Sequence, residues 1–560
     1  MTKGAFCLVL HGHLPWVLHH GRWPHGEDWL YEAASETWLP LLEVLDQLVE
    51  EGIRPAWTVG LTPILLEQLR KPEFVKGFEA YLQDCAAQAD SDERDFNAWG
   101  HGEIAWLAQR HQVHFAAQVR QLEAIDGDIP GAFIAHARAG RIEILTSNAT
   151  HGYHPLLLHD RCGRAQVRCG VATSERHLGW RPRGAWLPEC AYRPPGEWTP
   201  PVVHGDTRWR EGVGTLFADE GVEFFFVEDC LVQNCTPWAE IRDGTVRPLQ
   251  PGESPDPGLA WHSVLEPVRV VEGGVLLPLT VLGRCNDVAE HVWNAEMGYP
   301  GDGRYLEFHK RHGQRGMRYW RVTSRKAGLG DKQNYEPDRA HEAVYTHADH
   351  FASQVRDRLA GHHHGTGGRQ GILCTPFDAE LFGHWWAEGP EFLLEVARRM
   401  HHDPDVTPCT VSEALDAHAA DKAAALPEGT WGAGGDHRVW LGEHTWFVWN
   451  AEYRAEDRFI DLWHRADWEK DDRIRELLSE AARQLLLLQA SDWPFVVSTG
   501  GAHDYGTRRF HEHVGHFDDL CLGVEDLLDG REPPPVTAAT LQYCRVADPV
   551  FPDLELGWWA

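Results

Sequence analysis

The chain has 560 residues, enough for two to four domains or for one large barrel with extensions. Its formal net charge of −32 disfavours nucleic acid and anionic membranes as partners, and no apolar run approaches the roughly 18 residues that span a bilayer. The N-terminal MTKGAFCLVLHGH has the pattern of a first strand and not of a signal peptide, so we expect a cytoplasmic protein.

Apolar periodicity predicts that strands and helices alternate along most of the chain. Strands are expected at 5–14, 54–60, 183–189, 222–227 and 371–378, and 141–155 is expected to be a strand that runs into a loop. Helices are expected at 35–52 (with Ser35 as N-cap), 165–178, 212–220, 340–359 and 389–400. Such alternation favours an α/β fold with a parallel barrel or a doubly wound sheet.

Several stretches depart from this alternation. Residues 68–140 are polar and helix-rich, which predicts a helical insertion between the two catalytic parts 1–67 and 141–420. The strand pattern fades after about residue 425, so 421–560 is expected to form a helical C-terminal domain. The Pro/Gly-rich stretch 236–262 and the run GHHHGTGG (361–368) are predicted to be loops.

Tryptophan is the outlier of the composition. The chain contains 26 tryptophans, and indole faces stack on the C–H faces of sugars, so an elongated aromatic-lined site is one interpretation. Burial in the core and placement at a protein interface are the alternatives. The twelve cysteines include no CxxC pair, which favours free thiols over a zinc site.

Polar side chains follow four of the predicted strands directly. Catalytic groups of a parallel barrel lie at the carboxyl ends of its strands, so these positions are candidate site residues. They are His11 and His13, His151 and His154, Glu189, and Asp378 with Glu380 close by.

Two isolated acids at separate strand ends, flanked by Trp and His, suit glycoside hydrolysis. One carboxylate attacks the anomeric carbon and the other protonates the leaving oxygen. Apolar neighbours would raise the pKa of the acid. The structural alternatives are that Glu189 pairs with Arg193 and that Asp378 caps the next turn.

The histidines allow a second interpretation. His11, His13 and His151 could instead bind the metal of a barrel hydrolase or deacetylase. A non-catalytic glucan-binding protein is a third possibility, although the presence of both acids weighs against it.

Seven longer motifs occur in order along nearly the whole chain. They are LHGHLPW, NATHGYHP, GAWLPECAYRP, GYPGDGRYLEFHK, TPFDAELFGHWW, GTWGAGGDHRVW and LQASDWPFVVSTG. With these motifs the chain resembles glycoside hydrolase family 57 and, within it, the 1,4-α-glucan branching enzymes. The resemblance implies an incomplete (β/α)7 barrel with a helical insertion and a helical C-terminal domain that forms one side of the substrate groove.

The resemblance also implies residue roles. It makes Glu189 the nucleophile and Asp378 the acid/base of a retaining enzyme that transfers α-1,4-glucan chains to a 6-hydroxyl, without a metal or cofactor. The substrate-binding positions it implies or suggests are His11, His13, His151, Arg284, Gly301, Trp385, Trp431 and Asp492.

The lack of a tyrosine in one part of the sequence keeps other activities of the family open. Branching members carry a tyrosine on a loop over the active site, and this sequence has no tyrosine between Tyr192 and Tyr299. Trp238 in the predicted loop 236–262 is the candidate substitute. An α-amylase or a 4-α-glucanotransferase therefore remains the alternative to a branching enzyme.

Overall fold

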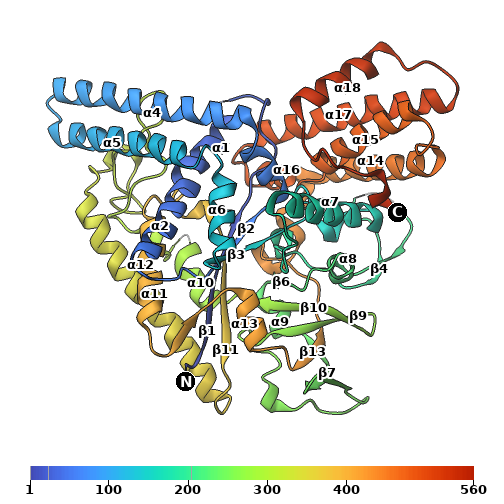
Figure 1. The fold of residues 1–560 in the computed structure, drawn as a ribbon, viewed down its shortest axis with the longest axis horizontal. Coiled ribbons are helices and arrows are strands. Elements are labelled where there is room, and N and C mark those ends of the chain that lie inside the picture. Colours follow the sequence, from blue (N-terminus) through green and yellow to red (C-terminus); the bar gives the residue numbers. More distant parts are fainter. Residues whose placement is uncertain (1, 23, 203–204, 295) are drawn as a thin grey trace.

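A buried parallel sheet lies at the centre of the molecule (Figure 1). The computed structural model describes residues 2–22, 24–202, 205–294 and 296–560. The sheet has the order β11 (Gly371–Asp378), β1 (Gly4–Gly12), β2 (Trp57–Leu61) and β3 (Ile142–Leu145). Every residue of β1 is buried, as expected for a strand that is covered on both faces. The register pairs His11 with Asp378, so both residues lie at the same carboxyl edge.

Further parallel segments extend this sheet and return to it. They are the short stretch 184–186, β6 (Phe224–Val227) and β10 (Val275–Gly283). The links are the parallel bridges Thr146–Ala185, Gly184–Phe224 and Arg284–Cys374 and the parallel pair β6–β10. Seven parallel segments are thus joined in chain order into a closed circuit, and the residues that follow them meet at one end.

Helices follow the strands much as the periodicity predicts. They include α2 (Leu39–Glu50), α7 (Asp160–Leu178), α8 (Val213–Asp219), α11 (Pro337–Gly365) and α12 (Gly389–His402). The first helix begins earlier than expected, because α1 (Glu27–Ala33) continues through a π-helical turn into α2. Ser35 therefore lies inside the helix, and its hydroxyl donates to Gln118 instead of capping. The α/β class is confirmed.

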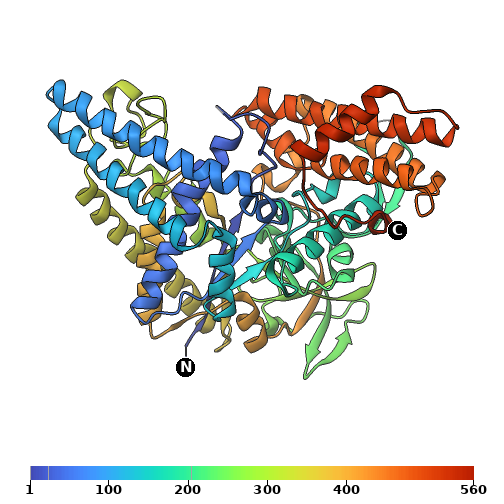
Figure 2. The same cartoon turned by 45° about the horizontal axis from the view of Figure 1, so that its top comes forward.

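Two groups of helices flank the same end of the sheet (Figure 1 and Figure 2). On one side α4 (Pro72–Ala98) packs along α5 (Gly102–Ala124). On the other side lie α14 (Trp446–Arg465), α15 (Asp472–Leu488), α16 (Asp492–Thr499), α17 (His503–Leu528) and α18 (Pro535–Ala547). The expectation of a helical C-terminal region is confirmed. In the part of the chain that the structure describes, no helix is both long and apolar enough to cross a bilayer.

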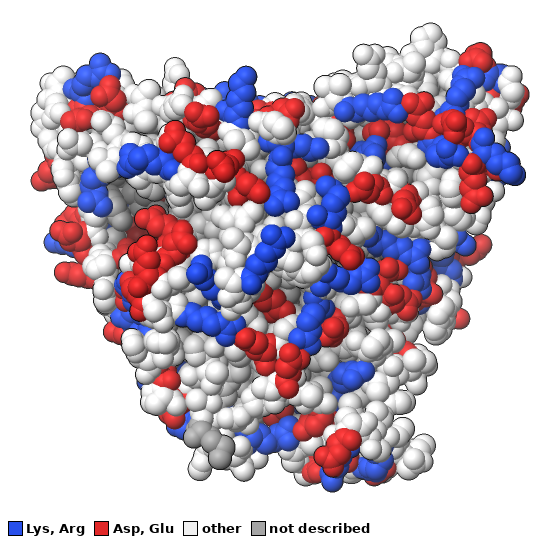
Figure 3. All heavy atoms as spheres, in the orientation of Figure 1, with Lys and Arg blue, Asp and Glu red and all other residues white. Residues whose placement is uncertain are grey.

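Shorter elements complete the fold. They are α3 (Pro63–Leu69), α6 (Ile129–Arg138), α9 (Asp229–Gln233), α10 (Asn286–Trp293), α13 (Val411–Ala417), β4 (Gly196–Trp198), β5 (Arg208–Arg210) and β12 (Val406–Pro408). Figure 3 shows acidic and basic side chains interspersed over one face of the molecule. The acidic excess therefore does not gather into a single patch on that face.

The stretch 236–262 is not the active-site loop that its composition suggests. It contains a hairpin of β7 (Thr236–Arg242) and β8 (Thr245–Pro248), and β7 also pairs with β13 (Lys422–Ala425). Trp238 packs against Ala239, Val271 and Ala423 in this small sheet. In Figure 1 the hairpin lies at the end of the molecule opposite to α16. The prediction that Trp238 covers the active site is wrong, because the Pro/Gly signal marks turns of a distant sheet.

Two further local predictions are wrong. The run at 361–368 is not a loop at its start, since α11 continues through Gly365 and His362 Nε2 lies 2.9 Å from Glu266 Oε1. The strands β9 (Val268–Glu272) and β10 were missed. Pro278 interrupts the apolar pattern of β10, yet this strand places Arg284 beside the other strand ends.

Candidate active site

A cavity of about 610 Å³ lies where the parallel segments end and the C-terminal region packs against them. Ten of the twelve predicted site residues line it: His11, His13, His151, Glu189, Arg284, Asp378, Glu380, Trp385, Trp431 and Asp492. Gly301 lines a neighbouring cavity. His154 lines neither cavity, because it is buried with its Nε2 2.9 Å from Asn148 Nδ2. Segments far apart in the sequence thus converge on one pocket.

Glu189 is held in an uncommon backbone conformation. Its φ of 57° and ψ of 20° lie in the left-handed region, and Cys190 next to it has a φ of 46°. Each such residue costs about 1–3 kcal/mol and persists only where its surroundings hold it in place. Cys190 is fully buried, and the backbone N–H of Trp431 donates to the Glu189 carbonyl at 3.2 Å. This packing fixes the turn and directs the carboxyl group into the pocket.

Two donors hold the Glu189 carboxylate. Trp431 Nε1 donates to Oε2 at 2.9 Å, and the Ser491 hydroxyl donates to Oε1 at 2.8 Å. Burial nevertheless raises the pKa of Glu189 to about 7, although both hydrogen bonds act in the opposite direction. Two hydrogen bonds therefore fix the orientation of the carboxyl group, while burial brings its pKa close to neutral pH.

A row of buried, hydrogen-bonded side chains continues from Ser491. His151 Nδ1 lies 2.8 Å from the Ser491 hydroxyl, and His151 Nε2 lies 3.0 Å from His11 Nε2. Because Ser491 gives its proton to Glu189, it must accept from His151 Nδ1–H, and His151 Nε2 then accepts from His11 Nε2–H. Burial holds the pKa of both histidines well below the usual range, so both are neutral. These tautomers make all three hydrogen bonds from Glu189 to His11, and among the described residues only His11 Nδ1 of this row is left without a partner.

The histidines can also be tested as a metal site. One ligand atom each from His13, His151 and Asp492 lies within 4.8 Å of the others. Both ring nitrogens of His151 are already engaged, and His13 Nε2 lies 2.9 Å from Asp492 Oδ2. A cation would have to break these contacts, whereas a sugar hydroxyl could join them. The arrangement fits hydrogen bonding to a ligand better than metal coordination.

Asp378 and Glu380, which the sequence does not separate, differ in the structure. Glu380 Oε1 accepts the backbone N–H of His13 at 3.0 Å, so this carboxyl group is tied to the loop after β1. Within the described residues the Asp378 carboxyl group makes no hydrogen bond or ion pair, and it faces the pocket. Burial and, as the second cause, the negative charge of Glu189 raise the pKa of Asp378 to about 7. Asp378 is the carboxyl group that is available to a bound molecule.

Aromatic side chains surround the two acids. The pocket is lined by Trp29, Trp293, Trp385, Trp431, Trp440 and Phe495. The Arg284 guanidinium lies over Trp431 at 5.6 Å and over Trp293 at 5.9 Å, which holds these rings in place. An apolar cavity with a few convergent polar groups is the usual form of a small-molecule site.

The sequence prediction missed some of these residues. Ser491 directly precedes the predicted Asp492 in LQASDWPFVVSTG, so the motif itself pointed to its vicinity. Trp293 ends α10 and Phe495 lies in α16, and no local pattern distinguishes them from core aromatics. Only their place in the folded chain shows that they face the pocket.

The model of a known family matches most of this chain, over residues 7–427, and its description is glycosyl hydrolase family 57. The chain belongs to this family. A second model, described as the C-terminal part of 1,4-alpha-glucan branching enzymes, matches residues 452–559. Ser491, Asp492 and Phe495 lie in that second match, so both matched parts contribute to the pocket.

Several known proteins are similar to this chain over nearly its full length. A 1,4-alpha-glucan branching enzyme of Thermococcus kodakarensis is 38% identical over 93% of this chain and 73% of its own length. The crystal structure of a branching enzyme of this family from Pyrococcus horikoshii superposes with a TM-score of 0.88 at 35% identity, covering 100% of this chain and 97% of that one. The α-amylase AmyC of Thermotoga maritima gives 0.80 at 28% identity, covering 100% and 99%. The resemblance to family 57 is confirmed.

Proposed function

We propose that this chain is a retaining 1,4-α-glucan branching enzyme. The observation that supports this most directly is the hydrogen bond from Ser491 to Glu189. It joins the part that matches the family 57 model to the part that matches the branching-enzyme C-terminal model, within one pocket. The relatives named above as branching enzymes support the same activity.

In the proposed first step, the Glu189 carboxylate attacks the anomeric carbon of an α-1,4-linked glucose residue. The bond from that carbon to the bridging oxygen breaks, and Asp378 gives its proton to this oxygen as the chain leaves. The raised pKa of Asp378 allows the group to hold a proton near neutral pH. Trp431 and Ser491 orient Glu189 for the attack.

In the second step, Asp378 takes the proton from the 6-hydroxyl of another glucan. The hydroxyl oxygen attacks the anomeric carbon, and Glu189 leaves as a carboxylate. We assign substrate binding to the other predicted residues: His11, His13, His151, Arg284, Gly301, Trp385, Trp431 and Asp492.

We also propose that the circuit of seven parallel segments is the incomplete (β/α)7 barrel of this family. The closing bridge between Arg284 and Cys374 supports this assignment. We retain 1–67 and 141–420 as its catalytic part and 68–140 as the insertion, since α4 and α5 pack along each other beside the sheet. The C-terminal domain 421–560 contributes Trp431 and Asp492 to the pocket.

An α-amylase is the second candidate function. The similarity to the Thermotoga maritima α-amylase and the lack of a tyrosine between Tyr192 and Tyr299 both favour it. In addition, the hairpin that contains Trp238 lies away from the pocket. Water would then replace the 6-hydroxyl in the second step.

Incubation with amylose separates the two functions. We expect new α-1,6 linkages, scored by proton NMR or by debranching, to exceed new reducing ends. Glu189→Gln serves as the inactive control, because its amide cannot form the glycosyl ester. Release of reducing ends without α-1,6 linkages would overturn the proposal in favour of the α-amylase.

A further inference from the structure

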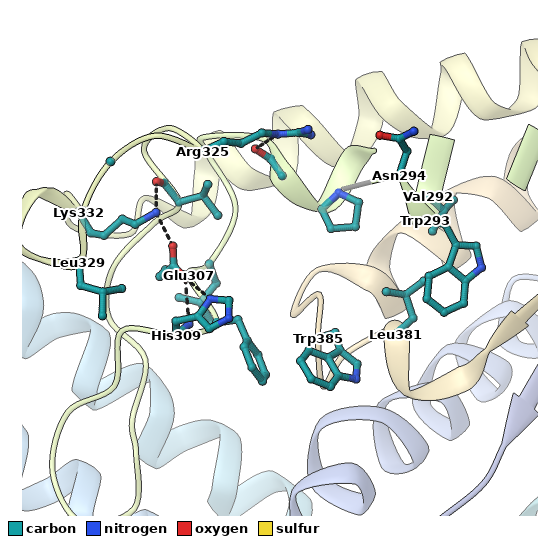
Figure 4. A pocket seen from close by; sticks show the side chains of 17 residues that line it. Val292, Trp293, Asn294, Glu307, His309, Arg325, Leu329, Lys332, Leu381 and Trp385 are labelled. Carbon is teal, nitrogen blue, oxygen red and sulfur yellow. Dashed lines mark hydrogen bonds and ion pairs between the residues drawn. The ribbon is translucent and has the colours of Figure 1, made fainter. Parts of the chain in front are cut away.

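A second cavity of about 650 Å³ adjoins the catalytic pocket (Figure 4). Trp293 and Trp385 line both cavities, so the two spaces meet at these indole rings. In Figure 4 these rings lie across the cavity from Leu329, Glu307 and Lys332. The mechanism proposed above uses no side chain that lines only this second cavity.

The lining of the second cavity suits a neutral, hydroxylated ligand. Trp385 is 53% exposed, and its ring centroid lies 4.5 Å from that of Phe308, so the two rings form one aromatic surface. Leu329 is 51% exposed on the far side. Lys332 Nζ lies 2.6 Å from Glu307 Oε2, and this buried pair neutralises both charges internally. Exposed rings beside satisfied charges match the apolar faces and hydroxyls of a sugar chain.

The position of the second cavity relative to Asp378 indicates whether it binds the donor or the acceptor glucan. Leu381 and Trp385 follow Asp378 in the turn after β11, and both line the second cavity. The acid/base group acts on the leaving oxygen and later on the incoming hydroxyl, so the acceptor enters on its side of the site. Every glucose residue of a glucan carries a 6-hydroxyl, so an acceptor residue inside the chain has glucan on both sides of it. Its chain must therefore run past the reacting carbon, which requires space beside the catalytic pocket.

We propose that the cavity between Phe308, Leu329 and Trp385 binds the acceptor α-glucan during transfer. This inference rests on the proposed branching function and adds a separate acceptor subsite to it. Gly301, which lines this cavity and not the catalytic pocket, then belongs to the acceptor side.

The test separates acceptor binding from donor binding. A maltooligosaccharyl fluoride serves as donor, since it forms the glycosyl-enzyme without a leaving glucan, and amylose is varied as acceptor. Phe308 lines only the second cavity, and Phe495 lines only the catalytic pocket. We expect Phe308→Ala to raise the apparent KM for amylose roughly fivefold or more and to increase the hydrolysed share, with the KM for the fluoride unchanged. Phe495→Ala should raise the KM for the fluoride.

Two further variants keep the result interpretable. Trp209→Ala removes a 65% exposed indole in β5, outside both cavities, and should match wild type in both constants. Leu329→Ala truncates an exposed side chain without disturbing the core and should also raise the KM for amylose. If wild type forms α-1,6 linkages while Phe308→Ala and Leu329→Ala leave the amylose KM unchanged, the acceptor subsite is refuted and the branching function stands. If wild type forms no α-1,6 linkages, the branching function itself fails, and the acceptor subsite fails with it.

Discussion

The hydroxyl of Ser491 lies 2.8 Å from Oε1 of Glu189 and donates a hydrogen bond to it across 302 residues of sequence. The bond connects the residue before α16 with the turn after the stretch 184–186. His151 hydrogen-bonds to the serine hydroxyl, and His11 hydrogen-bonds to His151. The orientation of the carboxylate therefore depends on a row of buried, neutral groups. Ser491 is thereby a positioning residue for the proposed nucleophile.

Removing this hydroxyl should change the pH dependence of activity. The bond favours the ionised form of Glu189, so Ser491→Ala should raise the pKa of Glu189 further. Glu189 must be ionised to attack, so the acid limb of kcat/KM should move to higher pH, with kcat about tenfold lower. Ser491→Thr keeps a hydroxyl and serves as the control. A pH profile of Ser491→Ala that overlays wild type would refute the role.

Trp431 provides both a ring and a donor. The sequence predicts a substrate-binding position, and the structure adds that Nε1 of Trp431 donates to Glu189 at 2.9 Å. We expect Trp431→Phe to lower kcat about tenfold with little change in KM for amylose, because an aromatic ring remains for stacking while the N–H donor is lost. Trp431→Ala should lower kcat similarly and raise KM as well. Equal kcat values for wild type and Trp431→Phe would show that the hydrogen bond does not matter for turnover.

Asp378 and Glu380 should respond differently to neutralisation. Asp378→Asn should lower turnover of amylose by on the order of 10³-fold, because no proton is available for the leaving oxygen. A glycosyl fluoride should partly restore the first step, since fluoride leaves without a proton. Glu380→Gln is the matched comparison, and fluoride should not rescue it selectively, because Glu380 holds the backbone of His13. Selective rescue of Glu380→Gln would transfer the acid role to that residue.

The two raised pKa values predict a narrow bell-shaped pH profile. The pKa values of Glu189 and Asp378 both lie at about 7, mainly through burial. Activity should fall at lower pH as Glu189 gains a proton and at higher pH as Asp378 loses one, so kcat/KM should peak near pH 7. With the fluoride donor, the alkaline limb of the first step should disappear. A flat profile from about pH 5 to 9 on amylose would contradict these assignments.

Removal of divalent metal should not affect the reaction. The nitrogens of His151 and Nε2 of His13 are occupied by hydrogen-bonding partners within the pocket. We therefore expect prolonged treatment with EDTA, followed by metal analysis of the protein, to leave the branching rate unchanged. Loss of activity that zinc restores would favour a metal-dependent hydrolase built on His11, His13 and His151.

The sequence by itself determined which residues stand at the strand ends. Glu189, Asp378, His11 and His151 were found because a strand, its carboxyl end and the residues after it are contiguous in the chain. Alternation of strands and helices likewise determined the α/β class, since it depends on local periodicity. Composition was a poorer guide at 236–262, because proline and glycine mark turns of a hairpin as readily as a loop over a site.

Only the tertiary structure decided how these residues act together. Ser491 and Glu189 lie 302 residues apart in the sequence, and His11 and His151 lie 140 apart. Both pairs meet only through the packing of these distant segments. The choice between Asp378 and Glu380 depends on which carboxyl group receives the His13 N–H, and that contact is set by the loop after β1. The raised pKa values depend on the burial of both carboxyl groups in the folded protein. Desolvation and hydrogen bonding are properties of the surroundings of a side chain, and distant segments supply those surroundings only after the chain has folded.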